Sequence, residues 1–293
     1  MRLLPLLLSA ALLLSSCGST WDWLWTRDLD AEVSTEDLII RDDTELSAGF
    51  RILLENAIEY TGEAHEGTEI AYIGREGSTN RDRIIVIDAG HQLKGSNKQE
   101  PNGPGSEIMK SEVSYGSTGA FTGQLEYELN LQVALLLRDE LIRRGYSVVM
   151  IRETNNVQIS NMNRAQIANK YRADAFIRIH ANGWTDPAMK GAKTICQSAR
   201  NPFPDCAAHY MRSRLLSSVI LEEFCAYTDM DLLPVFETDD NTGTNWSQVP
   251  TTIVEMGFLS NKEDDSLMRT ETFRSEAAVG IANGLDAYFR ELY

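Results

Sequence analysis

The chain has 293 residues, of which 43% are hydrophobic and 24% are charged. This balance is typical of a globular protein with one large folded domain, and it excludes a fibrous or low-complexity chain. The formal net charge is −16. Proteins that bind nucleic acid neutralise phosphates with clustered lysines and arginines. We therefore expect no binding to DNA or RNA, and we interpret the negative charge as a solvated acidic surface.

Residues 1–16 carry one basic residue followed by a short leucine-rich run. The run is too short for a comfortable membrane-spanning helix and is typical of a secretory signal peptide. Its end, Leu14-Ser15-Ser16-Cys17, resembles the lipobox of bacterial lipoproteins, in which cleavage leaves the cysteine as a lipid-bearing first residue. The resemblance implies attachment to a membrane surface through Cys17. An ordinary signal peptide with an incidental cysteine is the alternative interpretation.

Residues 17–82 are acidic and interrupted by glycines, which indicates a tether between the anchor and a folded domain. Within the tether, Leu46–Tyr60 carries apolar residues at helical spacing and predicts one short amphipathic helix. We expect the main folded domain, which carries the candidate site described below, to occupy residues 83–293.

Strand and helix patterns alternate through residues 83–293. Apolar, β-branched runs predict strands at Arg83–Ala89, Ser147–Ile151, Ala175–His180 and Thr251–Glu255, with weaker edge strands at Ala192–Cys196 and Leu232–Phe236. Helical spacing of apolar residues predicts helices at Leu125–Arg144, Asn161–Tyr171, Ala207–Tyr227 and Phe273–Tyr288. This alternation predicts an α/β fold with a single twisted, mostly parallel sheet and helices on both faces.

The segment Gln92–Gly123 contains more serine, asparagine and glycine than apolar residues, which predicts a long loop. Loops of this length in compact domains are usually functional or unstructured. Composition leaves open whether the loop is a lid, a substrate wall or a partner-binding insertion.

Three cysteines follow Cys17, namely Cys196, Cys206 and Cys225. Export permits disulfides, and a bond between Cys196 and Cys206 would close a short loop. The odd number of thiols leaves the pairing open. The chain has no Cys-x-x-Cys sequence, so the cysteines give no support to a zinc site.

Polar side chains stand at the ends of three predicted strands. His91 follows the first strand after an Ala-Gly pair, His180 ends another, and Glu255 ends the last. Parallel strands end at the same edge of a sheet, where ligand sites collect. Glu126 lies in the first turn of the helix after the long loop, where the helix dipole favours a carboxylate. Two histidines and a carboxylate form a known catalytic zinc arrangement, with the second carboxylate free to move protons.

Four segments, in order, resemble the motifs of zinc-dependent N-acetylmuramoyl-L-alanine amidases. They are Asp88-Ala89-Gly90-His91, Glu126–Leu131, Ile179–Asn182 and Val254–Asn261. The resemblance covers the chain from about Arg83 to the C-terminus. It implies a twisted α/β sheet and one zinc ion per chain, held by His91, Glu126 and His180, with Glu255 as the catalytic glutamate.

Two departures from the family pattern concern the surroundings of the site. Gln92 follows the first histidine, where members often have a second glycine, and the segment 92–125 is longer than in compact members. Glu128 competes with Glu126 for the role of ligand. A helix turns by about 200° over two residues, so only one of these carboxylates can face the strand ends. The motif favours Glu126.

The resemblance implies hydrolysis of the amide between N-acetylmuramic acid and L-alanine in peptidoglycan. Glu255 would take a proton from the attacking water and deliver it to the departing nitrogen. The implied protein is exported and lipid-anchored to the cell membrane, facing the cell wall, with peptidoglycan and a membrane surface as partners and any activator protein unidentified. Two alternatives are a non-catalytic peptidoglycan-binding lipoprotein with an amidase-like fold and a zinc peptidase that cleaves another amide.

Four further polar residues lie near the predicted strand ends. Arg152 and Arg164 could bind substrate carboxylates or pin a loop, and structural pairing is the expectation we prefer. Asn182 and Asn261 follow two of the motifs, where orienting a ligand and forming a turn are both open interpretations.

Overall fold

A computed structural model of the chain describes residues 50–53, 69–74 and 77–292, all of which belong to one compact unit. The predicted signal peptide, Cys17 and most of the predicted tether lie outside the described residues. The main sheet has eight strands in the order β1-β2-β6-β3-β7-β10-β8-β9. Their bounds are β1 (Phe50–Leu53), β2 (Ile70–Ile73), β6 (Ser147–Met150), β3 (Ile84–Ala89), β7 (Ala175–Asn182), β10 (Thr251–Phe258), β8 (Lys193–Cys196) and β9 (Phe236–Glu237).

The four central strands β6, β3, β7 and β10 are parallel, and β9 runs parallel to β8. The pairs β1 with β2, β2 with β6, and β10 with β8 are antiparallel. The predicted α/β fold with a mostly parallel sheet is confirmed. Because β6, β3, β7 and β10 point the same way, their carboxyl ends meet at one edge.

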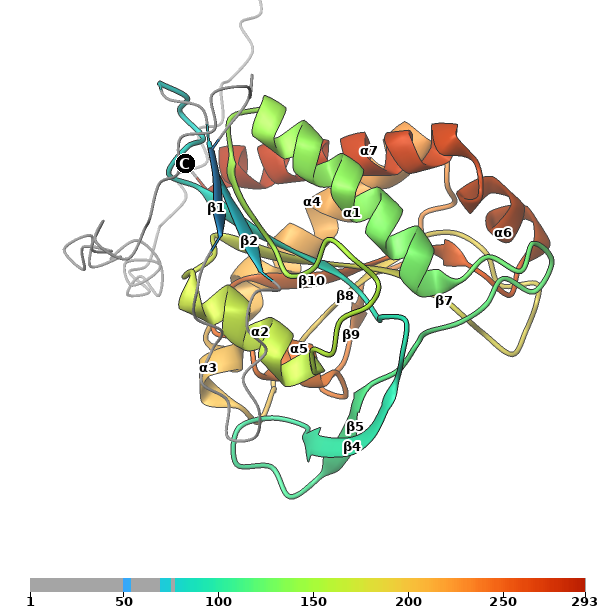
Figure 1. Cartoon of the computed structure of the whole chain (residues 1–293), viewed down its shortest axis with the longest axis horizontal. Coiled ribbons are helices and arrows are strands. Elements are labelled where there is room, and N and C mark those ends of the chain that lie inside the picture. Colours follow the sequence, from blue (N-terminus) through green and yellow to red (C-terminus); the bar gives the residue numbers. More distant parts are fainter. Residues whose placement is uncertain (1–49, 54–68, 75–76, 293) are drawn as a thin grey trace, which may run out of the picture. The chain divides into compact units, whose positions relative to one another are not determined.

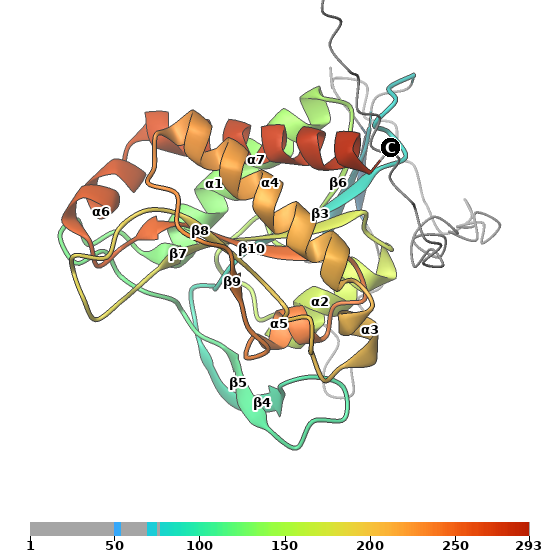
Figure 2. The same cartoon turned by 180° about the vertical axis from the view of Figure 1, so that it is seen from behind.

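Helices cover both faces of the sheet (Figures 1 and 2). One face carries α1 (Glu126–Arg143), α4 (Tyr210–Thr228) and α7 (Glu271–Glu291), with α6 (Lys262–Met268) leading into α7. The opposite face carries α2 (Asn161–Lys170), α3 (Pro204–Ala207) and α5 (Thr242–Asn245). The layers explain why strand β3 is apolar apart from Asp88, since a strand covered on both faces buries nearly all of its side chains.

The helix α1 shows how the sequence pattern positions the sheet edge. Its apolar stripe is buried against the sheet, and the stripe includes Leu129, Val133, Leu137 and Leu141. Burying one such leucine contributes roughly 1.5–3 kcal/mol to stability. The stripe fixes the rotation of α1, and that rotation decides which residues of its first turn face the strand ends.

Two strands precede the expected start of the catalytic domain. Residues Phe50–Leu53, predicted to be helical, form β1 and pair with β2. Short apolar runs fit helix and strand alike, and here pairing with a distant partner overrides the local spacing. The rest of Leu46–Tyr60 lies outside the described residues. Since β2 pairs with β6, the sheet includes residues before Arg83.

The predicted loop Gln92–Gly123 contains an antiparallel hairpin, so the expectation of a loop throughout is wrong. Its strands, β4 (Ser96–Pro101) and β5 (Met109–Val113), form a separate two-stranded sheet, drawn at the bottom of Figure 1. Most of their side chains are exposed or half-buried, and their polar composition therefore hides the strands from a search for apolar runs.

Three smaller boundaries also differ from prediction. The predicted helix Ala207–Tyr227 is two helices, because α3 ends at Ala207 and α4 begins at Tyr210. The predicted strand Leu232–Phe236 shrinks to an isolated bridge at Leu232 and the two-residue strand β9. Strand β9 takes the sheet edge, so β8 lies one position inside it.

Cys196, Cys206 and Cys225 are buried free thiols, so the disulfide between Cys196 and Cys206 is not formed. Burial raises the pKa of the Cys196 thiol to about 11. Within the part of the chain that the structure describes, no helix combines the length and the apolar character that crossing a membrane requires.

Candidate active site

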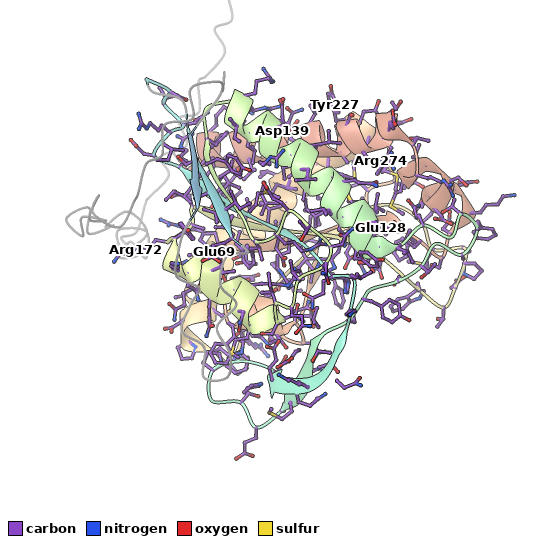
Figure 3. All side chains as sticks on the ribbon, viewed as in Figure 1. Glu69, Glu128, Asp139, Arg172, Tyr227 and Arg274 are labelled. Atoms are coloured by element: carbon purple, nitrogen blue, oxygen red, sulfur yellow. The ribbon has the colours of Figure 1, made fainter. Side chains whose placement is uncertain are left out.

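His91, Glu126 and His180 meet at the carboxyl edge of the parallel strands. His91 follows β3, Glu126 is the first residue of α1, and His180 lies in β7. One ligand atom from each of the three residues lies within 4.8 Å of the others. The His-Glu-His cluster lies at the N-terminal end of α1, because Glu126 is the first residue of that helix. Glu128, two residues further on, is labelled in Figure 3 and marks this end of the helix. Three separate elements therefore bring together the residues predicted as metal ligands.

One carboxylate oxygen stands between the two imidazoles. Glu126 Oε1 is 3.0 Å from His91 Nε2 and 3.3 Å from His180 Nδ1. Burial alone would raise the pKa of Glu126, but hydrogen bonds to the two histidines hold it well below its usual range. Burial lowers the pKa of His180 to about 4. At neutral pH the cluster therefore contains an anionic carboxylate and a neutral His180, which are the metal-binding forms.

Glu126 is held on both sides by hydrogen-bond donors. The Ser117 amide donates to Oε2 at 2.7 Å, and the Ala181 amide donates to Oε1 at 3.2 Å. One turn along α1, Asn130 donates to the Gly90 carbonyl at 3.2 Å. Glu128 is exposed, so only Glu126 faces the strand ends.

His91 has a left-handed backbone with a φ of 62°, which is rare for a residue with a side chain. Such a conformation costs on the order of 1 kcal/mol and is retained where function needs it. The imidazole Nδ1 lies 2.9 Å from Ser114 Oγ and 3.1 Å from the Ser114 carbonyl. Ser114 thereby holds the ring so that Nε2 faces Glu126.

Two glycines leave space for the imidazole rings. A Cβ atom on Gly90 would lie 2.2 Å from the ring of His180, so any larger residue there would displace that ring. Gly116 has a φ of 88°, and a Cβ there would lie 2.8 Å from Glu126 Oε2 and 2.9 Å from His91 Cδ2. The glycine before His91 is thus a spatial requirement of the cluster.

Glu255 lies beside the cluster on the neighbouring strand. In the parallel pair of β10 and β7 it is directly opposite His180. Its Oε2 atom is buried and has no hydrogen-bond partner among the described residues. Burial, followed by the negative charge of Glu126, raises the pKa of Glu255 to about 8, although Lys193 and Arg178 act in the opposite direction. A carboxyl with a pKa near neutrality suits a group that accepts and returns a proton.

Asp88 forms a second buried polar group one row away from His180. Its carboxylate is 2.5 Å from Arg164 Nη1 and 3.0 Å from Arg178 Nε. Burial would raise the pKa of Asp88, but the two guanidinium groups hold it well below its usual range. Sequence reasoning did not single out Asp88 or Arg178 for such a pair. Their signal was the presence of charged residues inside otherwise apolar strands.

Arg152 and Arg164 are structural, as expected from the preferred reading of the sequence. Arg152 is fully buried and donates to the carbonyls of Ala89, Gly90 and Tyr127 at 2.8, 3.1 and 2.9 Å. Arg164 donates to the carbonyl of Ala89 at 3.0 Å. The two arginines therefore pin the turn from which His91 emerges.

Gln92 and Asn261 also have structural partners. Gln92 Oε1 accepts hydrogen bonds from Arg164 at 2.9 Å and from the Ile159 amide at 3.1 Å. Gln92 therefore ties the start of the long segment to the Asp88 group. The side chain of Asn261 caps α6 by accepting from the amides of Glu263 and Asp264.

The His-Glu-His cluster fits a divalent metal ion. His180 Nε2 is a buried nitrogen with no hydrogen-bond partner in the described part of the chain, which is unusual for a buried polar atom. Two imidazoles and one carboxylate are nitrogen and oxygen donors of the kind that catalytic zinc sites use, with a fourth position left for water or substrate. The unsatisfied atom and the donor set agree with the same type of site.

The family model Amidase_3, described as N-acetylmuramoyl-L-alanine amidase, matches residues 85–287. The chain belongs to this amidase family. The match begins in β3 and ends in α7, so it includes His91, Glu126, His180 and Glu255. The enzyme is accordingly an N-acetylmuramoyl-L-alanine amidase with peptidoglycan as its substrate, as the motifs implied.

Similar proteins support the family and the fold. The chain is 29% identical over 207 residues to the uncharacterized protein YqiI of Bacillus subtilis, covering 71% of this chain and 85% of YqiI. It is 25% identical over 248 residues to the N-acetylmuramoyl-L-alanine amidase AmiA of Escherichia coli, covering 71% of this chain and 84% of AmiA.

The fold is also shared with a solved amidase structure. The amidase Ami1 from Mycobacterium smegmatis aligns with a TM-score of 0.64 at 24% identity, covering 72% of this chain and 98% of Ami1. This likeness independently supports the α/β arrangement of the sheet and helices.

Proposed function

We propose that this amidase uses one zinc ion held by His91, Glu126 and His180, with Glu255 as the catalytic glutamate. The observation that carries the proposal is the juxtaposition of a three-residue donor set with a buried, unpartnered carboxylate. The three ligand atoms lie within 4.8 Å of one another, and Glu255 is directly opposite His180 in the sheet. A metal site and a proton-transfer group therefore share one edge of the sheet.

In the proposed reaction the metal ligands hold the zinc ion and Glu255 moves the proton. When bound, zinc supplies Lewis acidity that polarises the amide carbonyl and lowers the pKa of water to about 7. Glu255 accepts a proton from the water whose oxygen attacks the lactyl carbonyl carbon. As the C–N bond breaks, Glu255 donates this proton to the L-alanine nitrogen, which leaves as an amine. The other product is the lactyl carboxylate of the muramic acid residue.

Digestion of purified sacculi by wild type and Glu255→Gln tests these roles. We expect the release of new L-alanine amino termini to fall by about 10²–10⁴-fold in the variant, the usual contribution of a positioned proton-transfer group. Zinc content should be unchanged, because Glu255 is not a ligand in this assignment. Glu128→Gln is the matched control, since Glu128 is an exposed glutamate beside the cluster.

Three outcomes would contradict the assignment. If Glu255→Gln kept wild-type activity, Glu255 would have no essential role in the reaction. Loss of zinc in that variant would make Glu255 a ligand. Release of amino termini other than L-alanine by the wild type would indicate a zinc peptidase, and binding to sacculi without any release would indicate a non-catalytic binding protein.

We also infer that the amidase is a lipoprotein. Peptidoglycan lies outside the cell membrane, so an enzyme with this substrate is exported. The sequence Leu14-Ser15-Ser16-Cys17 supports cleavage after residue 16 and a lipid on Cys17. The residues between Cys17 and the sheet would then form the tether, which is shorter than residues 17–82 because β2 belongs to the sheet.

Fractionation of cells that express Cys17→Ser tests the anchor. We expect the wild type in the membrane fraction and the variant outside it, with Cys225→Ser as a control thiol that is buried in the fold. Retention of Cys17→Ser in the membrane fraction would contradict the lipid anchor and favour an ordinary signal peptide or another mode of attachment.

A further inference from the structure

Lys193 lies next to the catalytic glutamate without being part of the motifs. It is the first residue of β8, and in the antiparallel pair of β8 and β10 it is directly opposite Glu255. Glu255 is in turn directly opposite His180 on β7. Residues directly opposite each other on neighbouring strands project from the same face of a sheet. His180, Glu255 and Lys193 therefore form one row on one face.

Aromatic rings surround the ammonium group of Lys193. Its Nζ atom lies 5.4 Å from the ring centroid of Phe236, 5.7 Å from that of Phe258 and 6.0 Å from that of Trp184. Aromatic rings attract a cation without neutralising its charge. They therefore hold the ammonium in place and leave it able to bind an anion.

The other described cations near this edge of the sheet already have partners, and Arg152 donates to the main-chain carbonyls of the turn before His91. Arg164 and Arg178 form salt bridges with Asp88, and Lys190 forms salt bridges with Asp231 and Glu263. Lys193 forms no salt bridge with any of the residues that the structure describes. In a chain with a net charge of −16, an unpaired cation beside the catalytic carboxylate has an uncommon position.

The surroundings of Lys193 are open to solvent on one side. Trp184 is 57% exposed and Phe236 is 52% exposed, although Lys193 itself is only partly exposed. Exposed aromatic rings that lie together around one cation form a local apolar surface that a ligand can contact. The two rings and the ammonium together offer apolar contact and one positive charge to a molecule at the site.

The reaction indicates which part of the substrate reaches Lys193. Glu255 delivers its proton to the L-alanine nitrogen, so the departing peptide lies beside Glu255. Lys193 is one strand further along the row, and neighbouring strands are about 4.8 Å apart. One residue of extended peptide spans about 3.3–3.6 Å. The group that Lys193 meets is therefore about one residue beyond L-alanine.

We propose that Lys193 determines specificity by binding a carboxylate on the stem-peptide residue that follows L-alanine, while Trp184 and Phe236 contact the adjoining peptide. This inference rests on the proposed function, because the departing peptide is placed by the role of Glu255. An amidase with this feature discriminates between stems whose second residue carries a free carboxylate and stems in which that group is an amide.

Two synthetic substrates test the inference. One is an N-acetylmuramoyl-L-alanyl-D-glutamyl peptide with a free α-carboxylate, and the other is the same compound with an α-carboxamide. We expect the wild type to cleave the carboxylate substrate with a kcat/KM about 10–100-fold higher, the range for a hydrogen bond to a charged group. In Lys193→Met the ratio should fall close to one, mainly through KM, and in Lys193→Arg it should be largely restored.

The ratio of the two kcat/KM values does not depend on the fraction of enzyme that is folded, since both substrates meet the same preparation. Lys190→Met is the matched control, because Lys190 has carboxylate partners of its own, and it should keep the wild-type ratio. A wild-type ratio near one, or an unchanged ratio in Lys193→Met, overturns the inference and leaves the amidase assignment intact. Failure of the wild type to cleave either substrate overturns the proposed function and this inference with it.

Discussion

Two adjacent rows of polar residues cross the same sheet and differ in how completely their atoms are paired. In the first row, both carboxylate oxygens of Asp88 contact guanidinium groups, from Arg164 and Arg178. In the second row, His180 Nε2 and Glu255 Oε2 are buried without a hydrogen-bond partner among the described residues. Leaving a buried polar atom unpaired costs about 1–3 kcal/mol. Incomplete pairing, more than burial, therefore distinguishes the row that we propose to be reactive, called the reactive row below, from the fully paired structural row.

The charges of the two rows respond differently to pH. Arginine neighbours hold the pKa of Asp88 well below its usual range, so this carboxylate stays ionised. Burial and the charge of Glu126 raise the pKa of Glu255 to about 8. The first carboxylate is a permanent charge that fixes the turn before His91, whereas the second can exchange a proton at physiological pH.

The largest effect is expected when the reactive row loses a donor. In His180→Ala the cluster keeps only two ligands, and we expect loss of bound zinc together with at least a 10³-fold loss of amidase activity. The free energy of unfolding measured in the presence of a chelator should fall by only about 1 kcal/mol, because the variant loses the contact of His180 Nδ1 with Glu126 Oε1 while His91 and two backbone amides still bind that carboxylate. Metal analysis, sacculus digestion and urea unfolding measure these three quantities. Full zinc occupancy in the variant would exclude His180 as a ligand.

The structural row should respond in the opposite way. Asp88→Ala leaves Arg164 and Arg178 buried without their counter-ion, and we expect a loss of about 3–5 kcal/mol in the free energy of unfolding. The matched control is Asp139→Ala, which removes an exposed partner of Arg138 on α1 and should cost at most about 1 kcal/mol (Figure 3). Urea unfolding compares the two. If the free energy of unfolding fell equally in Asp88→Ala and Asp139→Ala, the buried Asp88 group would contribute no more to stability than an exposed ion pair.

The reactive row was largely predictable from the sequence. His91, His180 and Glu255 each end an apolar run, and the alternation of strands and helices implies that parallel strand ends meet. The choice of Glu126 over Glu128 followed from helix geometry and the motif. The structure brings these residues to one edge of the sheet, and the sequence could place them there because the inference depends on local periodicity and on one general property of parallel sheets.

Other features depend on contacts that local patterns do not contain. The strand β1 was mistaken for a helix, because its identity rests on pairing with β2. The hairpin of β4 and β5 is too polar and exposed to show an apolar run. The place of Lys193 opposite Glu255 requires the antiparallel register of β8 and β10, which no spacing in the sequence reveals.

Glu100 provides an intermediate case between the two rows. It lies in β4 and is fully buried, and burial raises its pKa to about 7. Unlike Glu255, its two oxygens accept hydrogen bonds from the Met162 amide at the start of α2, at 3.1 and 3.2 Å. Unlike Asp88, it forms no salt bridge within the described residues. A raised pKa therefore does not by itself identify a catalytic carboxylate, and pairing must be considered with it.

The smallest predicted effect is a change in how the free energy of unfolding depends on pH when Glu100 is replaced. The pKa of Glu100 is raised from 4.5 to about 7 on folding, so the native state binds a proton more tightly than the unfolded chain. Stability from this group is present below about pH 4.5 and is lost as the pH rises to about 7. A shift of this size corresponds to about 3 kcal/mol. In Glu100→Gln the side chain is neutral at every pH, so this part of the pH dependence should vanish.

Urea unfolding at pH 5 and pH 8 measures the difference between wild type and Glu100→Gln. The raised pKa of Glu255 makes stability fall in the same direction, but it does so in both proteins and cancels in the comparison. Glu107→Gln, at an exposed position between β4 and β5, is the control and should retain the wild-type dependence. If Glu100→Gln also retains it, Glu100 is ionised in the native state, and the Ser160 hydroxyl, the Met162 amide and the charge of Arg178 are then enough to keep a buried carboxylate charged.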